Sequence, residues 1–179
     1  PFSENEALIE YTFFTPYLTE ETIYDEQLKK YISEYLKLDT YEILNEEQGI
    51  IPMTDFPFEK DNSAKITKIG TGGGWVKAST GYSFKHTEKK ISKIIKNIKS
   101  GHKPSKDLFL RKYKFYDAIF LDVLARRNDK GEQIFSKFYQ KNSVEEIFAY
   151  LDEETPFNED LKIMFSLFDP EFIISFFRK

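Results

Sequence analysis

The hydrophobic pattern predicts strands in the first part of this chain and helices in the rest. Residues 7–14, ALIEYTFF, are rich in β-branched and aromatic side chains and lie between the polar stretch SENE and a Thr-Pro pair, which predicts a strand. Residues 40–54 and 64–70 show similar strand-like patterns. Between the first two of these strands, residues 20–37 repeat apolar side chains at helical spacing, at Tyr24, Leu28, Tyr31, Ile32 and Tyr35.

Helical patterns follow residue 80. Residues 80–99 form the first, with Gly101 as the stop signal, and residues 108–127 are apolar on most sides, which predicts a mostly buried helix. The first of these helices places five large apolar side chains on one face: Phe84, Ile91, Ile94, Ile95 and Ile98. Shorter helices are predicted over 130–141, 143–151 and 158–167. A last helix begins at DPEF, with Asp169 as N-cap, Pro170 in the first helical position and Glu171 in the first turn.

Strands followed by helices favour an α+β fold with an antiparallel sheet. We expect a division into residues 1–69, a sheet with one inserted helix over 20–37, and residues 70–179, a glycine-rich loop with the C-terminal helices. Pro1 is not a start Met, and FSENE looks like a hairpin turn whose first strand is missing. These features predict a piece of a longer protein.

The glycine-rich stretch IGTGGGWVKASTGYSF, residues 69–84, is the least ordinary part of the chain. Glycine is placed where the backbone needs a positive φ or where another group approaches closely. A P-loop requires a Gly directly before its Lys-Ser/Thr pair, but Val76 precedes Lys77 here. The dinucleotide motif G-x-G-x-x-G begins at Gly70 and Gly72 and then meets Trp75. Two interpretations remain, a tight turn or a backbone surface for an anionic or polar ligand.

Composition narrows the function classes. The net charge of −4, from 26 basic and 30 acidic side chains, gives no indication of nucleic-acid binding. Cysteine is absent, which excludes disulfides, thiolate catalysis and Cys-based zinc sites, and no metal site is predicted. Aromatic residues make up 17% of the chain, with 18 Phe and 11 Tyr. Such a content suits a core and also a large apolar ligand.

Four stretches together resemble one family. ALIEYTFF, EEQGIIPMTDF, KIGTGGGWVKASTGYSFKHTEKK and FYDAIFLDVLARRNDKGEQIFSKFY are similar, in this order, to the C-terminal half of flavin-dependent bacterial lycopene β-cyclases. The likeness covers nearly all of the 179 residues. It implies that a missing N-terminal half carries the Rossmann strand that holds the FAD pyrophosphate. The present chain then supplies a sheet over the flavin ring, the second glycine loop and the helical tail.

The resemblance also implies a flavin-contacting loop. In this reading the helix from Thr80 points its N-terminus at the ring, where a reduced flavin is anionic. One departure from the family is Ala78, where a Pro usually precedes Ser-Thr-Gly. The implied cofactor is reduced FAD, with NAD(P)H as a possible electron source. The expected flavin-binding residues are Gly70, Thr71, Gly73, Thr80, Gly81 and Tyr82.

The implied chemistry is cyclisation of lycopene end groups through a carbocation to β-rings, without net redox change. Glu10, in LIEYT, matches the strand carboxylate of the family and is the expected catalytic residue, although alternation alone predicts an outward-facing side chain. Related flavoproteins, a hydroxylase or a reductase of isoprenoid chains, remain alternatives, as does a binding module without catalysis. A carotenoid substrate implies a cytoplasmic protein that is peripheral at the inner membrane.

Other polar groups have simpler interpretations. His86 and His102 are too far apart for a helical ligand pair and are predicted to lie at the surface, and Asp55 suits a loop cap better than a substrate contact. The acidic stretch YLDEET, with Asp152, Glu153 and Glu154, is typical of a solvated region between helices. The helix over 80–99 carries a lysine face, which is either solvated or attached to anionic lipid: Lys85, Lys89, Lys90, Lys93, Lys96 and Lys99.

Overall fold

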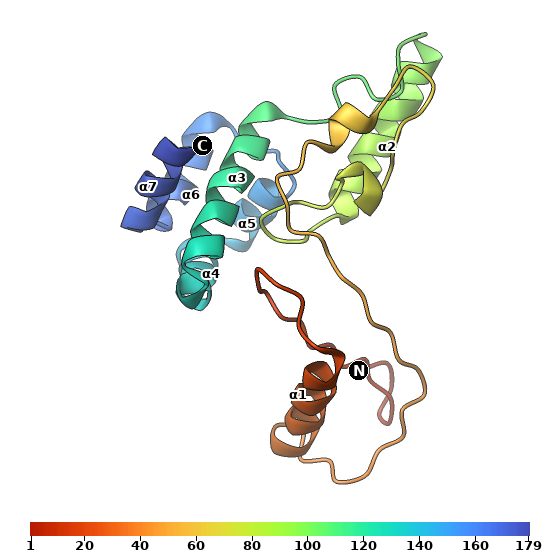
Figure 1. The fold of residues 1–179 in the computed structure, drawn as a ribbon, viewed down its shortest axis with the longest axis vertical. Coiled ribbons are helices and arrows are strands. Elements are labelled where there is room, and N and C mark those ends of the chain that lie inside the picture. Colours follow the sequence, from red (N-terminus) through yellow and green to blue (C-terminus); the bar gives the residue numbers. More distant parts are fainter. The chain divides into compact units, whose positions relative to one another are not determined.

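Helices are the only regular elements of this protein. The computed structural model describes residues 1–179, and it holds seven α-helices, three short 3₁₀ turns and no β-strand (Figure 1). The predicted α+β fold with an antiparallel sheet is therefore wrong. The chain divides into two compact units, Pro1–Gly49 and Ile50–Lys179. The division into residues 1–69 and 70–179 follows the expected sheet and the glycine-rich loop, and it stays a prediction.

The three predicted strands are irregular, and the reason is the lack of a pairing partner. Residues 7–14, 40–54 and 64–70 form no ladder of backbone hydrogen bonds with another segment. Their large apolar side chains, such as Leu8 and Ile43, are exposed. Strand propensity mainly measures how well a side chain fits a pleated, half-buried surface. Without a neighbouring strand that surface does not exist, and local sequence has no means of supplying it.

The first unit contains one helix, α1 (Glu21–Glu34), as the spacing over 20–37 predicts. Only Ile32 of this helix is buried. The preceding segment packs on α1 through aromatic side chains, since the Phe13 and Tyr24 rings meet edge to face with centroids 5.0 Å apart. The helix ends three residues before the predicted limit, and Lys37 then takes a left-handed φ of 57°.

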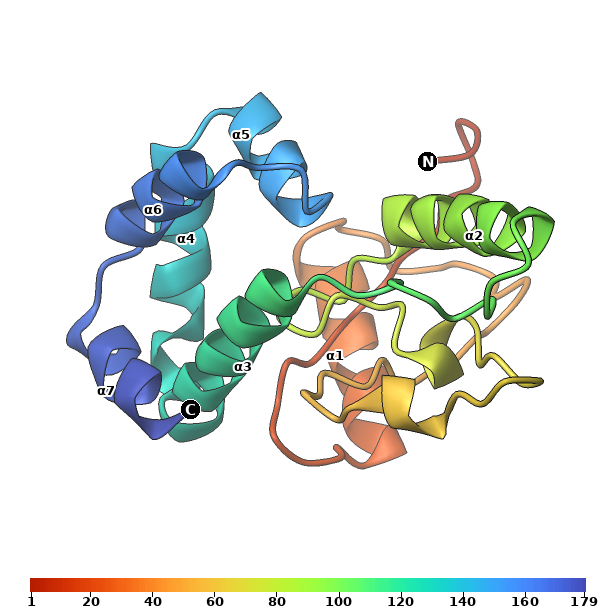
Figure 2. The same ribbon diagram turned by 90° about the horizontal axis from the view of Figure 1, so that it is seen from above.

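The second unit begins with an irregular segment that holds two 3₁₀ turns, η1 (Phe58–Asp61) and η2 (Thr71–Gly73). Six helices and a third turn, η3 (Asn128–Lys130), follow, and all the helices expected beyond residue 80 are present. α3 lies beside α7, and α4 packs against α5 and α6 (Figures 1 and 2). The helices are α2 (Phe84–Lys99), α3 (Arg111–Arg126), α4 (Gly131–Lys141), α5 (Val144–Leu151), α6 (Phe157–Ser166) and α7 (Pro170–Arg178).

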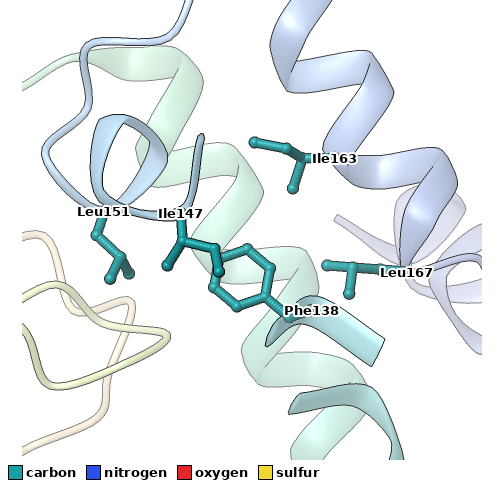
Figure 3. Close-up of a cluster of buried hydrophobic side chains, with 5 residues drawn as sticks. All are labelled: Phe138, Ile147, Leu151, Ile163 and Leu167. Carbon is teal, nitrogen blue, oxygen red and sulfur yellow. The ribbon is translucent and has the colours of Figure 1, made fainter. Parts of the chain in front are cut away.

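The core of the second unit lies where α4, α5 and α6 meet. Figure 3 shows the ring of Phe138 from α4 among aliphatic side chains of the two other helices and of the segment after α6. The cluster consists of Phe138, Ile147, Leu151, Ile163 and Leu167. Burial of such side chains contributes about 1.5–3 kcal/mol each, so this cluster is a main stabilising element.

Two helix starts test the sequence reasoning in opposite ways. At α7 the Asp169 carboxylate accepts the Glu171 N–H at 3.0 Å with Pro170 in the first turn, as predicted. At α2 the prediction is wrong by four residues, because the helix begins at Phe84 and not at residue 80. Gly81 takes a φ of 76° there, a left-handed conformation that interrupts a helix.

The buried residues of α2 are polar: His86, Lys90 and Asn97. The lysine face predicted over 80–99 is therefore wrong at Lys90, which is buried. The apolar face of the helix is largely exposed, at Phe84, Ile91, Ile95 and Ile98. Amphipathic spacing identified the helix but did not show which of its faces packs against the unit.

Candidate functional site

The glycine loop is a tight turn held by its own backbone. Gly70 and Gly74 take positive φ angles of 61° and 69°, which a residue with a Cβ rarely adopts. The N–H groups of Gly73 and Gly74 donate to the carbonyls of Gly70 and Thr71, both at 3.0 Å. The N–H groups of Thr71 and Gly72, at the start of η2, take no backbone partner. Two donors thus remain free for another acceptor.

The four glycines differ in what surrounds them. A Cβ on Gly73 would lie 2.4 Å from the carbonyl oxygen of Lys68, and one on Gly74 would lie 2.6 Å from the Phe58 ring. Around Gly70 and Gly72 there is open space. Close packing therefore explains why positions 73 and 74 are glycines. The open side of the loop is consistent with a surface that another molecule approaches.

A second turn follows at once. The Lys77 carbonyl accepts the N–H groups of Thr80 at 3.2 Å and Gly81 at 2.8 Å, and the Lys77 N–H donates to the Tyr82 carbonyl at 2.7 Å. The hydroxyl of Thr80 accepts the Tyr82 N–H at 3.4 Å. This turn fixes the backbone of Lys77, so the side chain of that residue has a defined direction.

The Lys77 side chain is fully buried and lies in a cluster of charged and aromatic groups. Its Nζ is 3.0 Å from Asp117 Oδ1 and 3.7 Å from Glu153 Oε1. It also lies 5.3 Å from the ring centroids of both Tyr113 and Tyr150. The angles do not satisfy hydrogen-bond geometry, so the ammonium has ion pairs but no hydrogen bond. A fully desolvated ammonium in this state retains unused donors.

Neighbouring polar groups complete the cluster. Ser79 donates its hydroxyl proton to Asp117 at 2.6 Å. His86 Nε2 lies 2.7 Å from the Leu151 carbonyl, which only accepts, so Nε2 carries the proton. Burial lowers the pKa of His86, with the Glu153 carboxylate opposing that shift. The ring is therefore neutral at pH 7, with Nδ1 as an acceptor 4.0 Å from Glu153.

Lys90 brings a second ammonium to this region. Its side chain is 8% exposed and its Nζ lies 5.0 Å from the centroid of the Phe109 ring. No carboxylate lies within ion-pair distance. Burial lowers the pKa of Lys90, and the nearby Lys77 charge adds to that shift.

These groups line a pocket of about 260 Å³ inside the second unit. Thr71, Gly74 and the 76–78 segment form one side of it, while α2 and α3 contribute others. Its lining combines aromatic rings with the charged cluster, and the groups used below are Phe56, Phe58, Phe109, Lys77, Lys90 and Asp117. A pocket with apolar walls and a few convergent polar groups is the usual form of a small-molecule site.

The residues that the resemblance points to are only partly brought together. Thr71 lines the pocket, and Gly70 and Gly73 belong to the same loop. Thr80, Gly81 and Tyr82 lie in the following turn, outside the pocket lining, and Tyr82 packs against the hydrophobic cluster of α4 to α6. Glu10 is in the first unit, exposed and without regular structure, and its Oε1 accepts the Thr12 hydroxyl at 3.0 Å. Asp55 lines the pocket and pairs with Lys179 at 2.7 Å.

Sequence reasoning missed the charged cluster. The sequence predicts no buried role for Lys77. The predictions for Lys90, on a solvated or lipid-attached face, and for His86, at the surface, are wrong because both side chains are buried. Glu153, predicted in a solvated acidic stretch, reaches Lys77 and takes a left-handed φ of 59°. One signal was available. Asp117 is an isolated carboxylate in the apolar run FYDAIFL, and such a residue requires a buried partner.

Comparison with known proteins places these features in a family. The family model described as lycopene cyclase protein matches residues 1–178. Neither the curated proteins nor the solved structures gave a match. None of the helices has both the length and the apolar character that crossing a membrane requires.

Proposed function

The chain belongs to the lycopene cyclase family, and from this premise we propose that it uses reduced FAD to close the ends of lycopene into β-rings. Family membership supports a carotenoid-cyclising enzyme. The finer assignment rests on the pocket beside the glycine loop, which offers free donors to a planar anionic ring. The pyrophosphate end of FAD would be held by an N-terminal dinucleotide-binding half that these 179 residues do not include.

The residues of the loop fit such a cofactor. The N–H groups of Thr71 and Gly72 have no backbone partner, and no Cβ stands in the way at Gly70 or Gly72. These donors replace the N-terminus of the helix as the expected flavin contact, because α2 begins only at Phe84. When bound, reduced FAD would supply an anionic ring that stabilises positive charge on the polyene.

The lining of this pocket suits the flat ring of the cofactor. The aromatic side chains Phe56, Phe58 and Phe109 match the faces of such a ring. Lys77 is already paired with Asp117 and Glu153, whereas Lys90 has no carboxylate within ion-pair distance and is the lining ammonium that an anionic ring would meet. We therefore assign the flavin ring to this pocket, with its anionic side toward Lys90. The polyene end would lie on the opposite side of the ring.

Glu10 remains our proposal for the acid and base of the reaction. Its support is the match to the strand carboxylate of the family, even though the strand itself is not formed. The Glu10 carboxylate is exposed, and its one hydrogen-bond partner is the neighbouring Thr12 hydroxyl. In a site closed to water, it would donate a proton to the polyene and then, as a carboxylate, stabilise the cyclised cation. Loss of a proton from the carbon beside the cationic centre would form the ring double bond, so the product is an isomer of lycopene.

The test is expression of the complete protein, with whatever segments precede these residues, in a bacterium that accumulates lycopene. A pigment with β-rings, an isomer of lycopene, supports the proposal. An oxygenated or more saturated pigment would instead point to a hydroxylase or a reductase. Unchanged lycopene together with flavin-free purified protein would favour a non-catalytic binding module.

Glu10→Gln provides the residue-level test, since it keeps the shape but carries neither the proton nor the charge. We expect a rate loss on the order of 10²–10³-fold with unchanged flavin absorbance. Glu6→Gln, a nearby exposed carboxylate, is the matched control and should leave the pigment unchanged. Normal product from Glu10→Gln would refute its role. Because the substrate dissolves in lipid, we also propose that the enzyme works peripherally at the cytoplasmic face of the inner membrane.

A further inference from the structure

α2 exposes large apolar side chains on one face, mainly in its C-terminal half. Phe84, Ile91, Ile95 and Ile98 are 75%, 44%, 48% and 58% exposed. Their spacings of seven, four and three residues place them on one face of a helix with about 3.6 residues per turn. Thr87 and Glu88 lie on this face between Phe84 and Ile91, so the continuous part is an isoleucine row of Ile91, Ile95 and Ile98. Single exposed apolar residues need no explanation, but such a row marks an interaction surface.

The opposite side of α2 already attaches the helix to the second unit. His86 is held by the Leu151 carbonyl at 2.7 Å. Asn97 Nδ2 donates to the carbonyls of Pro104 at 3.0 Å and Lys106 at 2.8 Å. Lys90 is buried between them along the helix. The isoleucine row is therefore not used in packing the helix, and it is available to a partner.

Lysines run alongside the apolar row. Lys85, Lys89, Lys96 and Lys99 follow one another about a quarter to a third of a turn away from the isoleucines, since each residue advances the helix by about 100°. Lys85 pairs with Glu88 at 3.0 Å and Lys89 with Glu154 at 2.7 Å. Lys96 and Lys99, near the C-terminal end, are exposed and have no carboxylate partner. Uncompensated positive charge thus borders an apolar surface.

We propose that α2 lies in the headgroup region of an anionic membrane, with the isoleucine row in the acyl boundary and the lysines at the phosphates. A helix with one apolar and one basic face binds at such an interface because it buries apolar area and because its positive charges attract anionic lipids. We commit to an anionic lipid surface as the partner, because Lys96 and Lys99 leave positive charge without a carboxylate partner beside the isoleucine row. The choice of a membrane as the partner rests on the proposed function, because a carotenoid substrate is drawn from lipid. The choice of α2 as the contacting helix rests on the geometry of that helix.

The test is co-sedimentation of the complete protein with phosphatidylcholine vesicles that contain or lack phosphatidylglycerol. We expect stronger binding to the anionic vesicles. The triple change Ile91→Ser, Ile95→Ser and Ile98→Ser should weaken it by about 10-fold or more, because buried apolar area is lost. Lys96→Glu with Lys99→Glu should weaken it by a similar factor, because each lysine near an anionic surface contributes about 1 kcal/mol.

Matched controls separate α2 from surface composition in general. Ile43→Ser with Leu44→Ser removes apolar side chains in the first unit that are more exposed than the three isoleucines. Lys29→Glu with Lys30→Glu reverses two exposed charges on α1. Both controls should keep at least half of the wild-type binding. Ile95→Trp, which keeps the row apolar, should bind at least as well as the wild type, so it tests the proposal even if the serine variant folds poorly.

Two results would overturn the proposal. One is equal wild-type binding to both vesicle types. The other is equal binding of the triple serine variant and the wild type to anionic vesicles. If that variant also lost flavin and had a lower melting temperature, another protein segment would be shown to cover the row. Loss of cyclisation with intact α2-dependent vesicle binding would refute the proposed function alone.

Discussion

Lys77 and Asp117 form an ion pair of 3.0 Å in which the lysine side chain is 0% and the aspartate side chain 9% exposed. The pair ties the glycine loop to α3, since the two residues belong to these elements. Ser79, from the same loop, donates to the same carboxylate. The position of the loop therefore depends on a few buried polar contacts.

Removal of one partner should be strongly destabilising. Lys77→Met leaves the Asp117 charge buried with only the Ser79 hydroxyl beside it, and breaking a buried pair in this way typically costs about 3–5 kcal/mol. We expect a loss of this order in the free energy of unfolding, measured by urea denaturation. Lys114→Met, which breaks an exposed pair with Glu59, is the control and should cost about 1 kcal/mol or less. Similar losses in the two variants would contradict the buried role.

The glycines of the loop should tolerate a methyl group very differently. Gly73→Ala places a Cβ against the Lys68 carbonyl, so the loop must shift, at a cost of about 1–3 kcal/mol. Gly72→Ala meets open space, and the melting temperature should stay close to that of the wild type. Thermal denaturation of both variants checks this contrast. Equal melting temperatures of the two variants would show that Gly73 is not packed against the Lys68 carbonyl.

His86 should make stability depend on pH in the mildly acidic range. Its folded-state pKa lies below the usual 6.5, chiefly because of burial. The unfolded chain then binds a proton before the folded chain does, so stability is complete above pH 6.5 and falls as the pH drops toward the folded pKa. We expect melting temperatures between pH 7.5 and 5.5 to show this decline. His86→Gln should flatten it, whereas His102→Gln, at an exposed position, should not.

The Asp169 carboxylate should stabilise the start of α7. It accepts the Glu171 N–H at 3.0 Å and binds Lys130 Nζ at 2.9 Å, and these two contacts, in that order, lower its pKa. Asp169→Ala should cost about 1 kcal/mol, the usual value of an N-cap, and Asp169→Asn should retain most of it. The pKa of Asp169 in the folded state lies below its ordinary value of 3.8. The stability that Asp169 contributes is therefore complete above pH 3.8 and is lost as the pH falls through the folded-state pKa. Melting temperatures at pH 7 and pH 3 measure both effects.

The helices could be predicted because their signals are local. Asp169, Pro170 and Glu171 specify the start of α7 within three consecutive residues, and the cap forms as expected. The strands could not be predicted in the same way, since ALIEYTFF describes a suitable strand but not a partner for it. Sheet formation depends on pairing between distant segments, which neither propensity nor alternation encodes.

The sequence predicted the glycine loop of the candidate site but not its cluster of charged side chains. Four glycines within five residues marked the turn directly. Lys77, Asp117 and Glu153 are far apart in the sequence, and only the packing of α3 and the turn after α5 brings them together. For α2 the period of 3.6 identified the helix, but a period cannot say which of two faces meets the core when the buried face is polar.

Trp75 is the only tryptophan of the chain, and it lies fully buried at the end of the glycine loop. Its indole emission is therefore an optical reporter of one place in the molecule. Emission should be blue-shifted while the loop is closed around the ring and should shift to the red when the loop opens, even if the helices stay intact. A flavin next to the loop would quench this emission by energy transfer. Fluorescence from a single native residue can thus follow cofactor loading in real time, with no label attached.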